Sequence, residues 1–199
     1  MTAPPPDGIL DIQTIEQACW NELARALTVR GHGWRSPTLA TIDMNGEPEA
    51  RTVILRAMDS SQATLSVYSD ARAPKVRQVE THPGVSMVFW CPQLSWQLRI
   101  RGRAQLILSG PEHARVLTGL AGSAGSRDYL SVSAPGQPLE VIADRPSLKS
   151  PGTAQPDPTS LHLAILQVQV IHADWLRLSG SGHRRMRFRP GHPATEIQP

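Results

Sequence analysis

Five polar side chains in the first half of the chain have the types needed to hold a phosphate group and a heterocyclic ring: Arg51, Arg56, Ser69, Lys75 and Gln97. The cations and the hydroxyl can neutralise and hydrogen-bond phosphate oxygens. Gln97 lies inside a predicted strand, where its amide can pair with donors and acceptors on a ring. Arginines on strands are more often solvated or ion-paired than bound to a ligand. The order and spacing of all five residues therefore carry the hypothesis of a phosphorylated, ring-bearing cofactor.

Most of the elements that must position these residues are predicted to be strands. Alternating apolar and β-branched residues favour strands over 38–44, 50–57, 62–68, 85–90, 95–108, 161–170, 174–178 and 186–188. Asn45-Gly46 is typical of a hairpin, which would join the first two strands, and a turn at 59–61 precedes the third. Because closure removes exposed strand edges, six to eight antiparallel strands favour a closed β-barrel.

Helices are predicted at the periphery of these strands. Residues 12–27 place apolar side chains at three- and four-residue steps, and the glycines in 30–33 are suited to ending a helix. The segments 74–81 and 111–120 each begin with a proline, which is tolerated in a first helical turn. Lys75 is then expected in the first turn of the second of these helices.

The remaining segments define the predicted domain organisation. Residues 1–8 are rich in proline and are predicted to be a disordered lead, whereas 9–199 are predicted to form a single domain. Within that domain, residues 121–160 are rich in glycine and proline. A loop of this length inside a domain is usually functional or disordered, so we expect a long loop or lid here.

Composition limits the class of protein and its partners. The 199 residues have a net charge of +3 and a pI near 9.3, which suits an anionic ligand as well as nucleic acid. No apolar run approaches the roughly 18 residues that span a bilayer, and the N-terminus has no basic region followed by an apolar core. We therefore expect a cytoplasmic protein with no membrane partner. Cys19 and Cys91 lack a C-x-x-C neighbour and the histidines lack metal-ligand spacing, which favours reduced thiols and no metal site.

Five segments, taken in order, resemble the FMN-binding split barrels of the pyridoxamine 5′-phosphate oxidase-like family. They are Arg51-Thr-Val-Ile-Leu-Arg56, Val67-Tyr-Ser-Asp70 with Lys75, Val85-Ser-Met-Val-Phe-Trp90, Trp96-Gln-Leu-Arg-Ile-Arg-Gly102 and His183-Arg-Arg-Met-Arg-Phe188. The resemblance covers residues 12–189 and is closest to a sub-group known by its similarity to the oxidase. It implies a mainly β fold with peripheral helices, an antiparallel split β-barrel that binds FMN and is homodimeric, with FMN at the subunit interface.

The resemblance also implies roles for individual residues toward FMN. Arg51, Ser69 and Lys75 would hold the phosphate. The isoalloxazine ring would lie along the backbone and side chains of Val53 and Ile54. Gln97 would reach the ring from the second subunit, and Arg187 would stabilise negative charge on the reduced ring. The full implied cofactor-binding set is Arg51, Val53, Ile54, Arg56, Tyr68, Ser69, Lys75, Gln97 and Arg187.

The chain departs from the family where the oxidase binds its substrate. An arginine expected directly before Lys75 is replaced by Pro74, and Arg72 is the residue that could compensate. The Arg-x-His pair of the oxidase matches His183 and Arg185, with the residue types exchanged. This segment is either an anion clamp or a solvent-facing basic strand. The substrate-binding candidates are Arg56, Arg127, Tyr129, His183 and Arg185, and no catalytic side chain is assigned.

Three functions are weighed on these features. The first is an FMN-dependent oxidoreductase that transfers a hydride from a small substrate to the flavin, with pyridoxine or pyridoxamine 5′-phosphate as one donor suggested by analogy. The second is a non-catalytic FMN-binding carrier or sensor, which would not need the 121–160 segment to fold over the flavin. The third, a basic β-barrel for single-stranded nucleic acid, is disfavoured because such proteins need aromatic stacking platforms and few aromatics are present.

Overall fold

The strands of the protein form one antiparallel sheet. The computed structural model describes residues 14–121, 129, 134–138 and 161–199; the predicted lead (1–8) and most of the predicted lid (121–160) lie outside them. Its strands are β1 (Thr38–Ile42), β2 (Pro48–Thr52), β3 (Leu55–Asp59), β4 (Thr64–Asp70), β5 (Gly84–Cys91), β6 (Trp96–Ile107), β7 (Leu163–Arg177), β8 (Arg184–Phe188) and β9 (Thr195–Ile197). Every pair of neighbouring strands is antiparallel, which confirms the predicted sheet type.

The order of the strands forces the sheet to curl into a barrel. The order is β2-β1-β5-β6-β7-β4-β3, so β2 and β3 lie at opposite ends of the row. Only Val53 and Ile54 separate these two strands in the sequence. A link this short spans at most about 11 Å at roughly 3.6 Å per residue, so the two ends of the row must meet. The split barrel predicted for this chain follows from that closure.

This closure also corrects one predicted element. The sequence predicts a single strand over 50–57, because the apolar run between Arg51 and Arg56 is uninterrupted. The structure breaks it at Val53 and Ile54, where the chain crosses from β2 to β3. Arg56 then falls at a shift of register, since Leu55 pairs with Val67 while Ala57 pairs with Ser66. The side chain of a residue at such a bulge points in a different direction from the one that regular strand alternation would give it.

A second correction concerns β7, which was predicted as two strands over 161–170 and 174–178. The structure has one strand of 15 residues, Leu163–Arg177. Its first half pairs with β4 and its second half with β8, while β6 lies along its other side. The registers of β6 and β7 shift between Arg101 and Gly102, so the long strands bend without breaking. The short strand β9 was not predicted.

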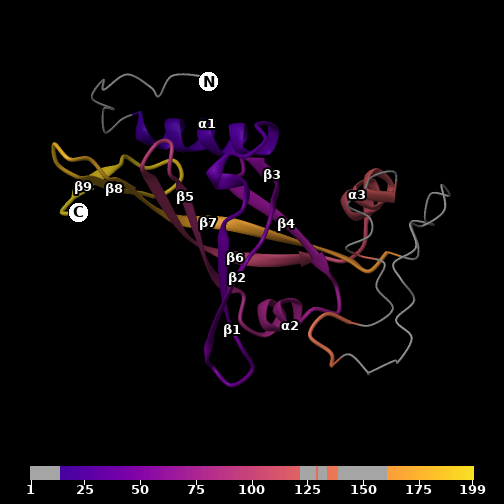
Figure 1. Cartoon of the computed structure of the whole chain (residues 1–199). Helices are drawn as coiled ribbons and strands as arrows, with labels where there is room; N and C mark the ends of the chain where they lie inside the picture. Colours follow the sequence, from indigo (N-terminus) through magenta and orange to yellow (C-terminus); the bar gives the residue numbers. More distant parts are fainter. Residues whose placement is uncertain (1–13, 122–128, 130–133, 139–160) are drawn as a thin grey trace.

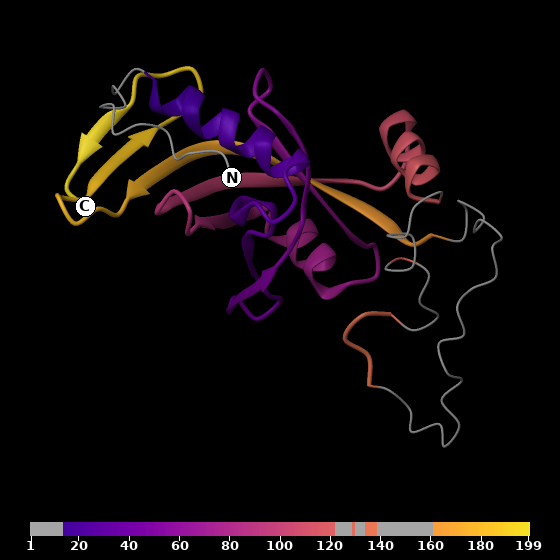
Figure 2. The same ribbon diagram turned by 45° about the horizontal axis from the view of Figure 1, so that its top comes forward.

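The helices cover different sides of this barrel. They are α1 (Ile15–Thr28), η1 (Gly33–Arg35), α2 (Pro74–Thr81) and α3 (Pro111–Ala121), and the predicted bounds of 74–81 are confirmed. Figure 1 and Figure 2 show α1 and α2 on opposite sides of the strands, with α3 at the end away from β8 and β9. Within the described residues, no helix is long and apolar enough to cross a membrane.

The core contains four aromatic rings that pack against one another edge-on or tilted. Trp34 lies 6.0 Å from Phe89 and 6.3 Å from Trp96, and Trp96 meets Trp175 edge-on at 5.1 Å between ring centroids. All four rings are nearly or fully buried, and such contacts add to the free energy gained by burying their area. Trp90, in contrast, is 42% exposed, so only Trp96 of the two tryptophans beside Cys91 packs in the barrel.

Candidate functional site

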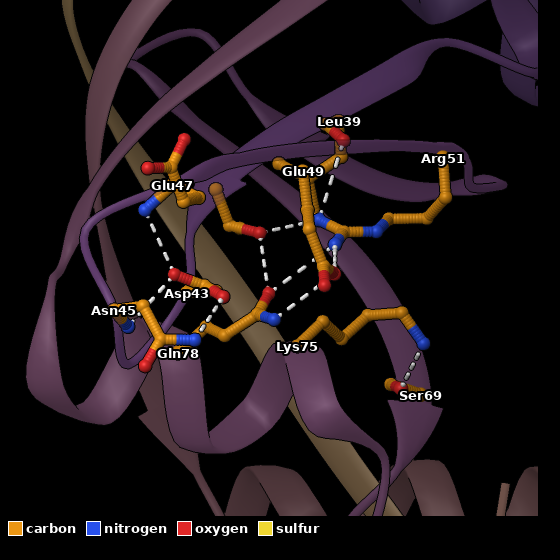
Figure 3. A network of polar contacts seen from close by, with 10 residues as sticks. Leu39, Asp43, Asn45, Glu47, Glu49, Arg51, Ser69, Lys75 and Gln78 are labelled. Carbon is orange, nitrogen blue, oxygen red and sulfur yellow. Dashed lines mark hydrogen bonds and ion pairs between the residues drawn. The ribbon is translucent and has the colours of Figure 1, made fainter. Parts of the chain in front are cut away.

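Three of the predicted phosphate ligands are brought together by β2, β4 and α2. Arg51 lies on β2, Ser69 on β4 and Lys75 in the first turn of α2. Lys75 Nζ donates a hydrogen bond to Ser69 Oγ over 3.0 Å. Figure 3 shows the side chains of Arg51 and Lys75 on neighbouring elements. We call these three residues the cationic cradle.

Lys75 lies where its positive charge is disfavoured. Burial lowers the pKa of Lys75, and the positive charge of Arg51 lowers it further, against the opposing effect of Asp70. A bound phosphate would counteract both causes, because it supplies hydrogen-bond acceptors and two negative charges. The cradle therefore fits a phosphate ester by its donors and by its charge.

Arg51 is held in position by residues that the sequence did not reveal. Its guanidinium donates to Thr41 Oγ1, to Glu49 Oε2 over 2.7 Å and to Gln78 Oε1 over 3.2 Å. Gln78 is 4% exposed and in turn accepts from Thr41 and donates to Glu49, at 2.6 and 3.0 Å. Figure 3 shows this closed network. Because its members satisfy one another, the network fixes the direction of the Arg51 guanidinium.

The hairpin between β1 and β2 sets this geometry. Gly46 has φ +86°, and its N–H bonds to Asp43 O over 3.2 Å, so the loop turns over three residues rather than two. Asp43 Oδ1 also accepts the N–H groups of Asn45 and Glu47, both at 2.8 Å. The resulting register places Thr41 opposite Glu49, which brings both beside Arg51.

Arg56 makes none of the contacts of the cradle but lies close enough to Tyr68 on β4 for its charge to act there. Its charge acts on Tyr68, whose pKa is raised by burial against the opposing effects of Arg56 and Arg115. Tyr68 and Ser69 are consecutive on β4, so their side chains face opposite sides of the sheet. Tyr68 packs in the same apolar cluster as Tyr129, which is 4% exposed. Arg56 and Tyr129, both substrate-binding candidates, are thus both linked to Tyr68, the first by its charge and the second by apolar packing.

Val53 and Ile54 form the link between β2 and β3. Val53 is 8% exposed and its N–H donates to Pro37 O over 2.9 Å, while Ile54 is partly exposed. They directly follow the strand that carries Arg51. Their predicted contact with a flavin ring stays a prediction, as does that of Gln97, which lies partly buried on β6.

Two more of the predicted residues, Arg185 and Arg187, lie around Asp174 on β7. Arg185 donates to Asp174 through two nitrogens, both at 2.9 Å, and Arg99 donates over 2.9 Å. Arg187 lies 3.4 Å from the same carboxylate. His183 stands apart in the exposed turn before β8, where its Nδ1 accepts the N–H of Ser179 over 3.1 Å. Arg185 is thus engaged by Asp174 while His183 is not, although both line one concavity of about 400 Å³ beside β9, and Arg127 lies outside the described residues.

Acid is expected to destabilise the fold through Asp174. Burial would raise its pKa, but hydrogen bonds from Arg185 and Arg99 outweigh that effect and lower it. A carboxyl group with a lowered folded pKa stabilises the protein above its unfolded pKa, near 3.9, and this contribution is lost as pH falls through the folded value. Urea unfolding at a series of pH values should show the loss below about pH 5. The curve of Asp174→Asn should be flatter there; parallel curves would contradict the assignment.

Arg72, the predicted replacement for a missing phosphate arginine, is engaged with Asp70. Its Nε and Nη2 donate to the two carboxylate oxygens of Asp70 over 3.0 and 2.7 Å. Burial would raise the pKa of Asp70, and the bonds from Arg72 lower it. Among the described residues no group of His, Cys, Asp and Glu is arranged to hold a metal ion, and Cys19 and Cys91 are buried free thiols.

The fold defines the class of the protein as a split barrel, and comparisons with solved structures show the same fold. A pyridoxamine 5′-phosphate oxidase-related, FMN-binding protein from Nostoc punctiforme superposes with a TM-score of 0.69 at 22% identity, covering 92% of this chain and 96% of that one. PhzG from Burkholderia lata, solved with tetrahydrophenazine-1-carboxylic acid, gives 0.71 at 18% identity, covering 100% and 98%.

Sequence comparison relates part of the chain to a family. Residues 17–108 match the family described as pyridoxamine 5′-phosphate oxidase, FMN-binding domain. The pyridoxine/pyridoxamine 5′-phosphate oxidase of Pseudomonas syringae pv. tomato is 36% identical over 70 residues, 35% of this chain and 32% of the relative. That of Thermosynechococcus vestitus is 34% identical over 77 residues, 39% and 36% of the two chains. The match thus spans about a third of these relatives, and the predicted family and cofactor are confirmed for the matched domain.

Proposed function

We propose that this protein is an FMN-dependent oxidoreductase acting on a small molecule. The observation that carries the proposal is the cationic cradle of Arg51, Ser69 and Lys75, which lies within the segment matched to an FMN-binding domain. The chemistry that FMN supplies when bound is acceptance of a hydride from the substrate. The cradle residues bind and orient the phosphate end, and the network around Arg51 keeps its donors in place before the ligand arrives.

The substrate side of the proposed site is formed by the other face of β4. Tyr68 lies there in the cluster that contains Tyr129, and the charge of Arg56 acts on it. A cation beside a partly buried phenol suits a substrate with an anionic or hydrogen-bonding group. This arrangement favours an enzyme over the alternative, a non-catalytic FMN-binding carrier or sensor, which needs only the cradle. The predicted lid and cytoplasmic location stay predictions.

The decisive experiment is anaerobic titration of the purified protein with FMN and then with pyridoxine 5′-phosphate, followed by absorbance. Flavin bands near roughly 375 and 450 nm that are bleached by the phosphate ester would support an oxidoreductase acting on vitamin B6 phosphates. Binding without bleaching would keep the flavoprotein and exclude this donor. Failure to bind FMN would overturn the proposal.

We propose further that two copies of the chain share each FMN. Arg187 lies on β8, which Figure 1 and Figure 2 place well away from α2 and the cradle. One chain alone would therefore not bring Arg187 and Lys75 to one flavin. Gln97→Ala and Arg187→Ala are each expected to weaken FMN binding about tenfold, the effect of losing one hydrogen bond to the ligand. Unchanged affinity in both variants, or a monomer in analytical ultracentrifugation, would contradict the shared site.

Glu49→Gln is expected to strengthen FMN binding about fivefold. In the structure the Glu49 carboxylate is 2.7 Å from the Arg51 guanidinium and thus competes with a phosphate for it. Glutamine can still accept from Arg51 and Gln78, but it removes the like charge, worth about 1 kcal/mol for a half-exposed pair. Titration of flavin fluorescence measures the change. Glu47→Gln, in the same exposed hairpin, is the matched control and should leave the affinity unchanged; weaker binding by Glu49→Gln would contradict the competition.

A further inference from the structure

The tip of the β1–β2 hairpin presents an asparagine followed by a glycine. Asn45 and Gly46 are both exposed. A Cβ atom added at Gly46 would have no atom within 4 Å beyond its chain neighbours, so the described chain leaves this side of the glycine open. The side-chain amide of an asparagine can react with the backbone nitrogen of the next residue, and glycine hinders that reaction least because it has no side chain.

The hydrogen bonds of the turn place the Asn45 amide beside a carboxylate and hold the Gly46 N–H only weakly. Asn45 Nδ2 donates to Asp43 Oδ2 over 3.2 Å, and the Gly46 N–H donates to Asp43 O over 3.2 Å, the long end of the usual range. Hydrogen bonds from the N–H of Glu47, and further ones from Asn45, lower the pKa of Asp43 against the opposing effect of burial. Asp43 is therefore a carboxylate at neutral pH, and its charge favours departure of the neighbouring nitrogen as ammonium.

We propose that Asn45 is a site of spontaneous deamidation, and that this modification weakens the cationic cradle as the protein ages. The Gly46 nitrogen loses its proton to a base and bonds to Asn45 Cγ, while the bond from Cγ to Nδ2 breaks and Nδ2 leaves as ammonia. Water then opens the cyclic imide at either carbonyl group, which returns a proton to the nitrogen and gives aspartate or isoaspartate. The reaction consumes water, releases ammonia and needs no oxidant, and asparagine is among the thermolabile residues of proteins.

The other asparagine of the chain, Asn21, lacks the features that make Asn45 reactive. Asn21 lies in the middle of α1 and accepts a hydrogen bond from Gln17 over 2.9 Å. The next residue is Glu22, whose side chain hinders attack and whose backbone N–H belongs to the hydrogen-bonded ladder of the helix. Deamidation is thus expected at Asn45 and not at Asn21, which serves as a control within the same molecule.

Deamidation changes both the charge and the length of the turn. A carboxylate at position 45 would replace the amide that now donates to Asp43, and like charges this close repel each other. Isoaspartate also adds a methylene group to the backbone of the turn. The ends of the turn are tied by the Asp43 N–H, which donates to Glu47 O over 2.8 Å, so added backbone between them disturbs this bond.

The same turn sets the register that orders Arg51. Thr41 is paired with Glu49, and both accept hydrogen bonds from the Arg51 guanidinium. A turn of altered length frays or shifts this pairing, and a shift by one residue moves each side chain to the other face of its strand. Arg51 would then lose the support that fixes its guanidinium, and a phosphate would have to order it on binding. This part of the inference rests on the proposed function, because it concerns FMN.

Peptide mass spectrometry of the full chain, aged at mildly alkaline pH with a matched sample at mildly acidic pH, tests the modification. The tryptic peptide 36–51 should gain about 1 Da in the alkaline sample, where base removes the Gly46 proton, and should be labelled by an isoaspartyl methyltransferase. The peptide that contains Asn21 should not change. Asn45→Gln is the blocking variant, since its longer side chain closes a ring less readily. An unmodified peptide 36–51, or equal gains at both asparagines, would overturn the proposal.

FMN titration of the same samples tests the link to the cradle. Aged wild type should bind FMN about fivefold more weakly than fresh wild type, and fresh Asn45→Asp, which has the charge but an ordinary backbone, about twofold more weakly. Aged Asn45→Gln should bind like fresh protein. Unchanged affinity in deamidated wild type, or an equal loss in aged Asn45→Gln, would overturn the link. Fresh wild type that binds no FMN would instead overturn the proposed function, and the mass measurement would still decide the modification.

Discussion

Arg51→Gln is expected to lower the affinity for FMN about a hundredfold. When a phosphate replaces Glu49 on Nη2, the guanidinium can donate two charge-assisted hydrogen bonds to it, from Nη2 and Nε. Each is worth roughly 1.5 kcal/mol or more, and each 1.4 kcal/mol changes affinity tenfold. Glutamine preserves some hydrogen bonding to Thr41 and Gln78 but loses the charge. The affinities of wild type and variant can be measured by quenching of flavin fluorescence.

Riboflavin provides the matched ligand for this experiment. It has the same ring but no phosphate, so its weaker binding should be the same in wild type and Arg51→Gln if the residue acts on the phosphate. Arg103→Gln, an exposed change on β6, should leave both ligands unaffected. Equal losses for FMN and riboflavin would show that Arg51 supports the barrel rather than the phosphate.

Gly102→Ala is expected to lower the free energy of unfolding by about 2–4 kcal/mol. A Cβ atom at this buried position would lie 2.5 Å from Gln169 O and 2.7 Å from a Val168 methyl group, and the nearer atom is backbone. Backbone in a paired strand cannot move aside without disturbing the β6–β7 ladder, so overpacking here should be severe. Urea denaturation followed by circular dichroism measures the loss.

Gly84→Ala is the matched control for this change. Gly84 is also a strand glycine, on β5, and a Cβ there would have no atom within 4 Å. Its substitution should alter stability by less than about 0.5 kcal/mol, as do most surface changes. Similar values for both variants would show that the crowding at Gly102 is relieved by bending of β6.

How far the sequence predicts the fold depends on whether the deciding signal is local. The bounds of α2 were predicted because Pro74 and the breaker His82-Pro-Gly84 mark both ends. The break at Val53 and Ile54 was not predicted. An apolar run has the same sequence pattern whether one strand continues through it or the chain crosses there to a second strand. The single strand β7 was predicted as two because its pattern changes at Ile171, where the register with β6 shifts.

The candidate site shows the same division. Residues of the right type in the right order predicted that Arg51, Ser69 and Lys75 would come together. Thr41 and Glu49 were missed because their place beside Arg51 follows from a hairpin register that the loop at Gly46 decides. Gln78 lies three residues after Lys75 and therefore on the same face of α2. This spacing would have been enough to suggest Gln78 as a member of the site.

The shared strand β7 has a consequence for the order in which the protein folds. The hairpins β1–β2 and β3–β4 are each local in sequence, so little chain entropy opposes their formation. Strand β4, however, pairs along its whole length with residues 163–169, about a hundred positions later in the chain. Contacts of such separation slow folding. Joining the two hairpins into a barrel must therefore wait for β7, and during synthesis the cradle residues would emerge long before the strand that completes their scaffold.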